Sequence, residues 1–361
     1  ELCRRVRQAR ACRVAIERPD GPVVDAVLAA GLEVVVVASR SVNALRERYG
    51  TSGNKSDRSD AYVLADCLRT DGHRWRSLDP DTPATVTLRS HVRARKDLVE
   101  TRVAVANQLR SHLRVVFPGA VGLFRDLDSP ISLRFLERFP SATRANWLSE
   151  KRLGSWLRAN GYSGRKTAHE LHRRLTEAPS GLLGDEGDTR GAVTLAYVAI
   201  IRSLRAQIDE LESRLEELLD AHPDAMIFRS LPRCATIRAA TLLAEIGDCR
   251  ARFPDAESLS CLAGIAPSTR TSGRHRAVTF RFSSDKKLRD ALCDFAGDSW
   301  RANTWAEHRY RQLRADGKTH PHAERILARS WTHIIWRCWR DHTPYNPAQH
   351  GAYQRLIAET G

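Results

Sequence analysis

The amino-acid sequence predicts an α/β domain followed by an all-α remainder. Near the N-terminus, strand-like stretches at 12–17 and 32–39 alternate with helical patterns, and this order is typical of a parallel α/β unit. Beyond residue 85 the hydrophobic spacing is mainly helical. The chain has 361 residues, 42% of them hydrophobic, so it is long enough for two or three domains with proper cores.

The N-terminal unit is expected to run in the order strand, helix, strand, helix, helix. The second strand, LEVVVVAS, is the clearest in the chain, because an uninterrupted β-branched run fits the middle of a parallel sheet. Ser56 precedes the third helix and is a suitable N-cap. The expected spans are 12–17, 23–31, 32–39, 41–50 and 56–70.

Composition then changes along the chain. No Gly or Pro occurs from Thr85 to Phe117, and apolar residues at helical spacing predict one long basic helix there. From Tyr197 to Leu218 apolar residues alternate at steps of four and three, which indicates a coiled-coil seam, with one buried helix of a bundle as the alternative. The predicted domains are an α/β domain with the long helix, a helical connecting region, a coiled coil and a helical C-terminal domain, over 1–120, 121–190, 191–222 and 223–361.

The charge balance points to a polyanionic partner. Lys and Arg number 58 against 43 Asp and Glu, a net charge of +15, and only seven of these cations are lysine. The planar guanidinium group suits bidentate phosphate contacts. The most apolar stretches are too short to cross a membrane, and the eight scattered cysteines without any C-x-x-C favour a reduced, cytoplasmic protein over a disulfide framework or a zinc site.

Three carboxylates form the first candidate site. Glu17 ends the first predicted strand, and Asp57 and Asp60 occupy the first turn of a helix at a spacing that directs both side chains from one face. Carboxylate oxygens are ligands that Mg²⁺ prefers. The alternative is that the two aspartates only favour the helix dipole.

The second candidate site is the segment STRTSGRHR at 268–276. Its serine Ser272 lies among Arg270, Arg274 and Arg276, as expected of a nucleophile beside a phosphodiester held by cations. His275 is near in sequence but has no identifiable orienting partner, and a basic loop with a bystander serine is the alternative reading. A weaker pattern at 230–248 has the residue spacing of a helix-hairpin-helix.

In that weaker pattern Arg233 and Ala235 stand where two hairpin glycines are expected, and both need a different turn geometry.

The motifs AIERPDG, KSDRSDAYVLADCLR, a distal SG and a downstream K-x-L-R together resemble the DEDD transposases of the insertion sequence 110 family. The resemblance covers nearly the whole chain. It implies a RuvC-like, RNase H-type domain with N-terminal strands missing, in which Glu17, Asp57 and Asp60 are the second, third and fourth acidic residues. It also implies that Ser272 is the serine nucleophile.

The sequence departs from the family pattern in three places. The sequence begins with Glu1, and its only methionine is Met226, so residue 1 is not expected to be the translation start. The strand that carries the first family aspartate is therefore expected upstream of Glu1. The hairpin glycines are replaced as noted. The basic turn before Lys286 and Lys287 carries Ser284 where Gly is usual, and both lysines are expected to contact nucleic acid.

The resemblance implies an RNA-guided DNA recombinase. Its expected partners are donor and target DNA, a structured guide RNA, Mg²⁺ and further copies of the chain, as a dimer or tetramer through the coiled coil, in the prokaryotic cytoplasm at the nucleoid. The alternatives are a metal-dependent, RuvC-like nuclease in which water replaces Ser272 as the nucleophile, and a non-catalytic nucleic-acid-binding scaffold.

Overall fold

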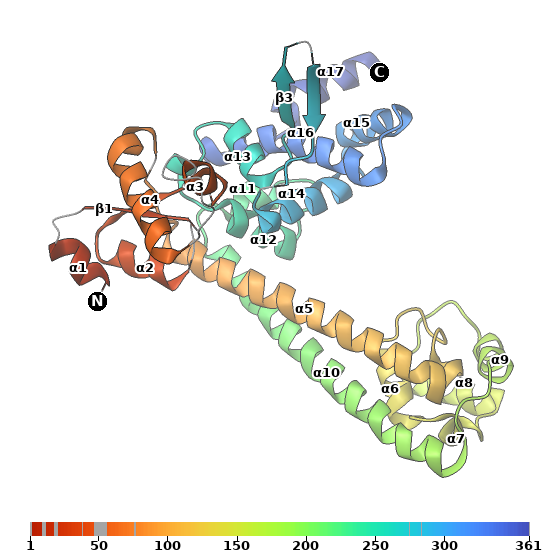
Figure 1. Cartoon of the computed structure of the whole chain (residues 1–361). Coiled ribbons are helices and arrows are strands. Elements are labelled where there is room, and N and C mark those ends of the chain that lie inside the picture. The colour runs from red at the N-terminus through yellow and green to blue at the C-terminus, as the bar shows by residue number, and fades with distance from the viewer. Residues whose placement is uncertain are drawn as a thin grey trace. The chain divides into compact units, whose positions relative to one another are not determined.

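The computed structural model (Figure 1) divides into two compact units. Unit 1 combines residues 1–85 with 246–361, and unit 2 consists of residues 86–245. The predicted domain boundaries after residues 120, 190 and 222 all fall inside unit 2. The structure describes residues 2–8, 12–17, 21–37, 39–46, 56–75, 77–273, 275–282 and 284–360.

The N-terminal part of unit 1 is an α/β segment in the predicted order. Strands β1 and β2 pair in parallel, with Arg13 opposite Glu33 and Ile16 opposite Val36. Ser56 caps the last helix, its hydroxyl accepting a hydrogen bond from the Ser59 N–H at 3.2 Å, which confirms the predicted N-cap. The elements are α1 (Leu2–Gln8), β1 (Arg13–Ile16), α2 (Pro22–Ala29), β2 (Glu33–Val36), α3 (Ser39–Arg46), α4 (Asp57–Asp71) and the 3₁₀ turn η1 (Gly72–Arg74).

Two small valine-rich cores hold this segment together. One face of the β1 and β2 pair packs against α2, and the other packs against α3 and α4. The alternation of buried positions along the short strands explains why valines serve both faces. The buried residues are Val24, Val27, Leu32 and Val34 in the first core, and Val35, Val37, Val42 and Val63 in the second.

The C-terminal part of unit 1 is helical except for one antiparallel hairpin. Strands β3 and β4 pair with Ser268 opposite Thr279 and Ser272 opposite His275. Buried Trp331 and Trp339 on α16 anchor its core. The elements are η3 (Arg250–Arg252), α13 (Ala256–Ala263), β3 (Ser268–Ser272), β4 (His275–Thr279), α14 (Lys286–Ser299), α15 (Thr304–Ala315), α16 (His320–Arg340), η4 (Pro347–Gln349) and α17 (Gly351–Thr360).

The two sequence segments of unit 1 are tied at residues 81–82 and 247–249. The Asp81 carboxylate accepts hydrogen bonds from the backbone N–H groups of Asp248 and Cys249 at 2.9 and 3.1 Å, and Thr82 donates from its backbone N–H and its hydroxyl to the Asp248 carboxylate. Burial alone would raise the pKa of Asp248, but the hydrogen bonds from Thr82 outweigh it and hold that pKa below its ordinary value. Gly247 has φ +86°, and a Cβ there would lie 2.3 Å from the Asp81 carboxylate, so the position requires glycine.

Unit 2 is built on two long antiparallel helices, α5 (Pro83–Val116) and α10 (Gly184–Asp220) (Figure 1). Arg95 on α5 pairs with Glu212 on α10 at 2.6 Å, and His112 bonds to Thr194 at 3.1 Å. From the first pair to the second, the residue number rises on α5 and falls on α10, so the two helices run antiparallel. The predicted long helix is confirmed.

The predicted heptad positions from Tyr197 to Leu218 lie within α10, which ends two residues before the predicted coiled-coil boundary at 222. Its seam positions Ile201, Ile208 and Leu215 are buried within the single chain. A coiled coil between subunits therefore stays a prediction.

The first part of α5 is also held by an ion pair with a later residue. The buried Glu245 carboxylate accepts two hydrogen bonds from the Arg93 guanidinium of α5, at 3.0 and 2.8 Å.

The loop between α5 and α10 forms a small helical cap, here called the tip, over residues 118–183. Its core is aromatic: the rings of Phe135 and Phe139 lie 5.1 Å apart, and Trp156 packs edge-on against Phe135. The elements are η2 (Pro118–Ala120), α6 (Pro130–Arg138), α7 (Ala142–Ala145), α8 (Glu150–Ala159) and α9 (Ala168–Glu177).

Two helices follow α10, and the second of them, but not the first, lies within the predicted helix-hairpin-helix pattern at 230–248. They are α11 (Ala225–Arg229) and α12 (Thr236–Ile246), and the intervening Arg233 has φ +55°. The backbone thus adopts at Arg233 the left-handed conformation that glycine would favour there. Within the described part of the chain, no helix is both long and apolar enough to cross a membrane.

Candidate functional site

The three predicted carboxylates line one cavity of unit 1. Glu17 directly follows β1, and Asp57 and Asp60 project from the first turn of α4, which packs against β1. The cavity has a volume of about 630 Å³ and is completed by apolar side chains such as Ile16 and Leu64. Residues distant in sequence therefore meet at the end of a parallel strand, where α/β folds place ligands.

Asp60 is already engaged in an ion pair with α3. The Arg46 guanidinium contacts both carboxylate oxygens, with Nε 2.6 Å from Oδ1 and Nη2 2.5 Å from Oδ2. The Asp60 side chain is 16% exposed, so this bidentate pair is partly shielded from water. Among the described residues, Glu17 and Asp57 have no hydrogen-bond or ion-pair partner in the structure.

The chemistry of these donors suits a hard divalent cation. Three carboxylates supply only oxygen ligands, as Mg²⁺ requires, and a strand end and a helix turn are rigid supports. In the described ranges, however, no three His, Cys, Asp or Glu side chains converge closely enough to hold a metal ion. The cavity therefore gathers the predicted ligands without arranging them as a closed coordination shell.

Ser272 is at the end of β3, beside the turn of the hairpin. It is exposed and stands opposite His275 in the strand register. Gly273, which follows it, has φ +54°, a left-handed conformation that allows a tight turn. The hairpin differs from the basic loop considered from the sequence, because Thr and Val residues on both sides of the turn favour extended backbone.

The predicted phosphate-binding residues around Ser272 are described only in part. Arg274 lies outside the described residues, and so do the side chains of Arg270, Arg276 and His275. Lys286 and Lys287 are described: they open α14 and are both exposed. Asp285 caps this helix, because its carboxylate accepts hydrogen bonds from the N–H groups of Lys287 and Leu288.

An aromatic surface beyond β4 was missed from the sequence. The Phe280 ring lies between the guanidinium groups of Arg289 and Arg325, at 4.6 and 4.7 Å. Phe282 packs edge-on against Phe280 with ring centroids 5.0 Å apart, yet it is 81% exposed. The alternation of Phe and Arg in FRF was the available signal, because exposed aromatics among cations are typical of nucleic-acid stacking surfaces.

Cysteine chemistry is disfavoured at the buried thiols. All eight cysteines are free. Burial raises the pKa of Cys293 to about 11 and also raises the pKa of Cys249 and Cys338. These thiols are protonated at neutral pH and are poor nucleophiles.

Two protein-family models match separate parts of the chain. A DEDD-type IS110 family model described as a transposase matches residues 1–118, which contain the carboxylate cavity. A second model, described as the transposase of the IS116/IS110/IS902 family, matches residues 225–311, which contain the serine hairpin.

Similar proteins extend the match across most of the chain. A transposase described for the IS117 mini-circle of Streptomyces coelicolor is 33% identical over 90% of this chain and 80% of its own length. The 43.6 kDa protein of insertion element IS110 from the same organism is 28% identical over 88% of this chain and 78% of its own. The 44.8 kDa protein of IS116 from Streptomyces clavuligerus is 28% identical over 89% and 80%, respectively. The chain therefore belongs to the IS110 family of insertion-sequence transposases.

Proposed function

We propose that this transposase is an RNA-guided DNA recombinase that cleaves and joins strands through a covalent bond between Ser272 and DNA. The observation that carries the proposal is the single cavity shared by Glu17, Asp57 and Asp60. This cavity supports the interpretation of the N-terminal segment as a RuvC-like domain. An exposed serine on a second, basic segment supplies the nucleophile that such a cavity lacks.

Each transfer is a substitution at phosphorus. Ser272 Oγ bonds to the phosphorus of the scissile phosphodiester, the bond to the departing DNA oxygen breaks, and that oxygen leaves as a hydroxyl while the serine loses its proton. In the second step a hydroxyl of another DNA strand attacks the phosphoserine ester and Ser272 regains its proton. One phosphodiester is thus exchanged for another without external energy.

Mg²⁺ fits this proposal through the carboxylates. Held by Glu17, Asp57 and Asp60, it would supply positive charge that stabilises the phosphodiester during its cleavage. Asp60 is paired with Arg46, so binding through all three carboxylates requires that ion pair to open.

The cationic and aromatic residues near the hairpin are proposed to hold DNA. Lys286 and Lys287, with Arg270, Arg274 and Arg276, would bind backbone phosphates, and Phe282 would stack on a base exposed near the cleavage point. The net charge of +15 is consistent with a steep loss of binding at high salt.

The remaining partners are proposed from the family and from surface features. A structured guide RNA would select donor and target DNA by base pairing, because side chains alone give little sequence information in such systems. Since the seam of α10 is covered within one chain, contacts between copies would use other positions of this helix, among which Val193, Leu195 and Ile200 are exposed. The complex would act on nucleoid DNA in the cytoplasm.

The serine step is tested with end-labelled DNA and a denaturing gel. The wild-type protein and the Thr271→Ala variant, which loses a neighbouring exposed hydroxyl of β3, are expected to carry the label covalently. Ser272→Ala is expected to carry none. Label that remains on Ser272→Ala protein would overturn the serine mechanism. Undiminished cleavage by Ser272→Ala without any adduct would favour a nuclease that uses water.

A further inference from the structure

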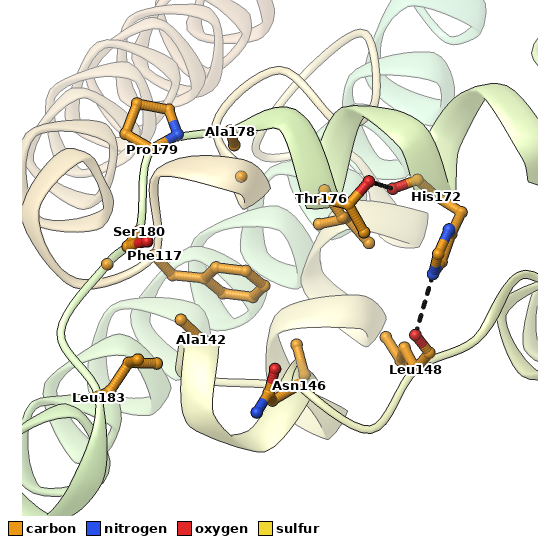
Figure 2. Close-up of a pocket in the computed structure, with 14 residues that line it drawn as sticks. Phe117, Ala142, Asn146, Leu148, His172, Thr176, Ala178, Pro179, Ser180 and Leu183 are labelled. Atoms are coloured by element: carbon orange, nitrogen blue, oxygen red, sulfur yellow. Dashed lines mark hydrogen bonds between the residues drawn. The ribbon is translucent and has the colours of Figure 1, made fainter.

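The tip of unit 2 contains a cavity that the proposed chemistry does not use (Figure 2). It has a volume of about 280 Å³, and its walls come from the end of α5, from α7 and α9, and from residues 178–183. We propose that this pocket receives one unpaired base of a single-stranded RNA. The inference rests on the proposed function only in taking a structured RNA as the source of that base.

The pocket has the size of a small heterocycle. Drug-sized ligands occupy cavities of roughly 300–1,000 Å³, so a cavity of about 280 Å³ suits a smaller, flat group. The neighbouring backbone is closely packed at two glycines: a Cβ on Gly181 would clash at 2.2 Å from the Val116 carbonyl oxygen, and one on Gly119 would make a tight contact at 3.3 Å from the Leu175 carbonyl oxygen. The tight backbone fixes the shape of the cavity.

The floor of the cavity is apolar and rests on a rigid support. Figure 2 shows the Phe117 ring among the lining residues, with Pro179 and Thr176 also around the cavity. Phe117 packs on Phe135 at a centroid distance of 6.2 Å, which holds its plane in place. Because Phe117 is only 5% exposed, the ring serves as a fixed apolar floor against which part of a base can pack, and not as an open stacking face.

Hydrogen-bonding groups on one side of the pocket are already satisfied. His172 Nε2 lies 3.0 Å from the Leu148 carbonyl oxygen, and the Thr176 hydroxyl donates to the carbonyl oxygen of His172 (Figure 2). The same hydroxyl also donates to the carbonyl oxygen of Arg173. These bonds fix the α9 wall. The α9 wall is therefore left with few free hydrogen-bonding groups that could select a ligand.

Asn146 and Ser180 are the groups available to a ligand. Both line the cavity, and neither side chain has a hydrogen-bond partner among the described residues. A carboxamide offers a donor and an acceptor side by side. This combination matches the edge of a nucleobase and is the means by which Asn recognises adenine.

The surroundings of the pocket favour a nucleic-acid strand. The tip carries eleven Lys or Arg against six Asp or Glu between residues 118 and 183. Next to Asn146, Trp147 is 48% exposed, and the Arg152 guanidinium lies over its ring at 5.0 Å. A neighbouring base has a stacking surface there, since exposed Trp and Arg together are typical of single-strand binding.

The physical cost of exposing a base favours RNA over duplex DNA. A paired base must be unstacked and rotated out of the helix, at a cost of a few kcal/mol. An unpaired base in an RNA loop is already available, and sequence-specific RNA recognition uses such bases. A pocket for one base is therefore matched to a loop or bulge of a structured RNA.

The test is a binding experiment with the full chain. Fluorescence anisotropy at fixed salt would compare short single-stranded homopolymers of adenosine, cytidine and uridine, and their deoxy counterparts. The wild-type protein is expected to prefer one of the three RNA homopolymers. Asn146→Ala is expected to weaken that preferred complex about tenfold and to leave the other two RNA complexes unchanged, which removes the preference.

Two matched variants complete the design. Asn107→Ala removes an exposed Asn of α5 outside the pocket and is expected to bind like the wild type. Ala142→Leu fills the cavity from α7 and is expected to remove the preference even if Asn146 is intact. Circular dichroism and thermal melting show whether each variant is folded.

The outcomes separate this inference from the serine mechanism, because the assay needs no cleavage. A wild-type protein without any base preference overturns the pocket assignment, as does a preference that survives both Asn146→Ala and Ala142→Leu. Equal affinity for the deoxy homopolymer overturns the assignment to RNA. Absence of a covalent adduct, by contrast, would leave the binding result intact.

Discussion

The carboxylate cavity and the serine hairpin are built in opposite ways. The cavity draws Glu17, Asp57 and Asp60 from separate elements that are packed on small valine cores, so its geometry depends on tertiary contacts. The hairpin presents Ser272 from a short contiguous segment, and among the described residues its two strands pair only with each other. In the mechanism proposed above, the cavity would therefore be the fixed binding site for the phosphodiester, and the hairpin would supply an accessible nucleophile.

The largest effect is expected at the cavity. Asp57→Ala removes an exposed carboxylate that has no partner among the described residues, so it is expected to reduce strand cleavage by about three orders of magnitude because charge stabilisation at the phosphodiester is lost. Single-turnover cleavage of labelled DNA measures the effect. Asp25→Asn alters a carboxylate in the equivalent first turn of α2 and is the control. Cleavage by Asp57→Ala at close to the wild-type rate would remove the cavity from the mechanism.

A smaller effect in the opposite direction is expected from Arg46→Ala. This change frees Asp60 from a partly shielded ion pair and removes a positive charge beside the cavity, so the affinity for divalent metal should rise about fivefold. Electron paramagnetic resonance of free Mn²⁺ measures that affinity directly. Arg69→Ala, which removes an exposed guanidinium group paired with Asp66 on the same helix, serves as the control. A weaker metal affinity in Arg46→Ala would show that Arg46 supports the metal-binding geometry instead of competing with it.

At the hairpin, Phe282→Ala should weaken DNA binding by about fivefold to tenfold, because one stacking contact is lost. Phe282→Trp should retain binding, since it preserves the aromatic face. Val278→Ala removes another exposed apolar side chain of the same hairpin and tests for loss of apolar area alone. Anisotropy with DNA that contains unpaired bases, in a Ser272→Ala background, measures binding without cleavage. Equal losses in Phe282→Ala and Val278→Ala would exclude stacking.

The regular elements were largely predictable from local pattern. The spans of β1, β2, α4 and α5 agree with the predicted strands and helices to within a few residues, because each has a strong period and a clear boundary such as Ser56 or Pro118. The valine run of β2 predicted a parallel, doubly covered strand, and β2 pairs in parallel with β1. The cavity was predictable from the same reasoning, since strand ends and following helices meet at one edge of a parallel sheet.

Other features depend on contacts that local pattern does not encode. The pairing of Arg46 with Asp60 joins two helices across a segment outside the described residues, and no periodicity specifies it. The hairpin at Ser272 has only five residues in each strand and a polar composition, so alternation gave little signal. The heptad pattern of α10 correctly marked a buried seam, but periodicity does not say whether a seam is covered by the same chain or by another copy.

The antiparallel arrangement of α5 and α10 has a consequence for how relatives can diverge. Between the Arg93 and Glu245 pair at one end and the tip at the other, each helix rises 1.5 Å per residue. Removal of one heptad from each helix would shorten this spacer by about 10.5 Å while the seam stays in phase. Insertions and deletions should therefore be tolerated here in steps of seven residues, matched on both helices. The distance between the Arg93 and Glu245 pair and the tip can then differ among relatives while the pocket of the tip stays the same.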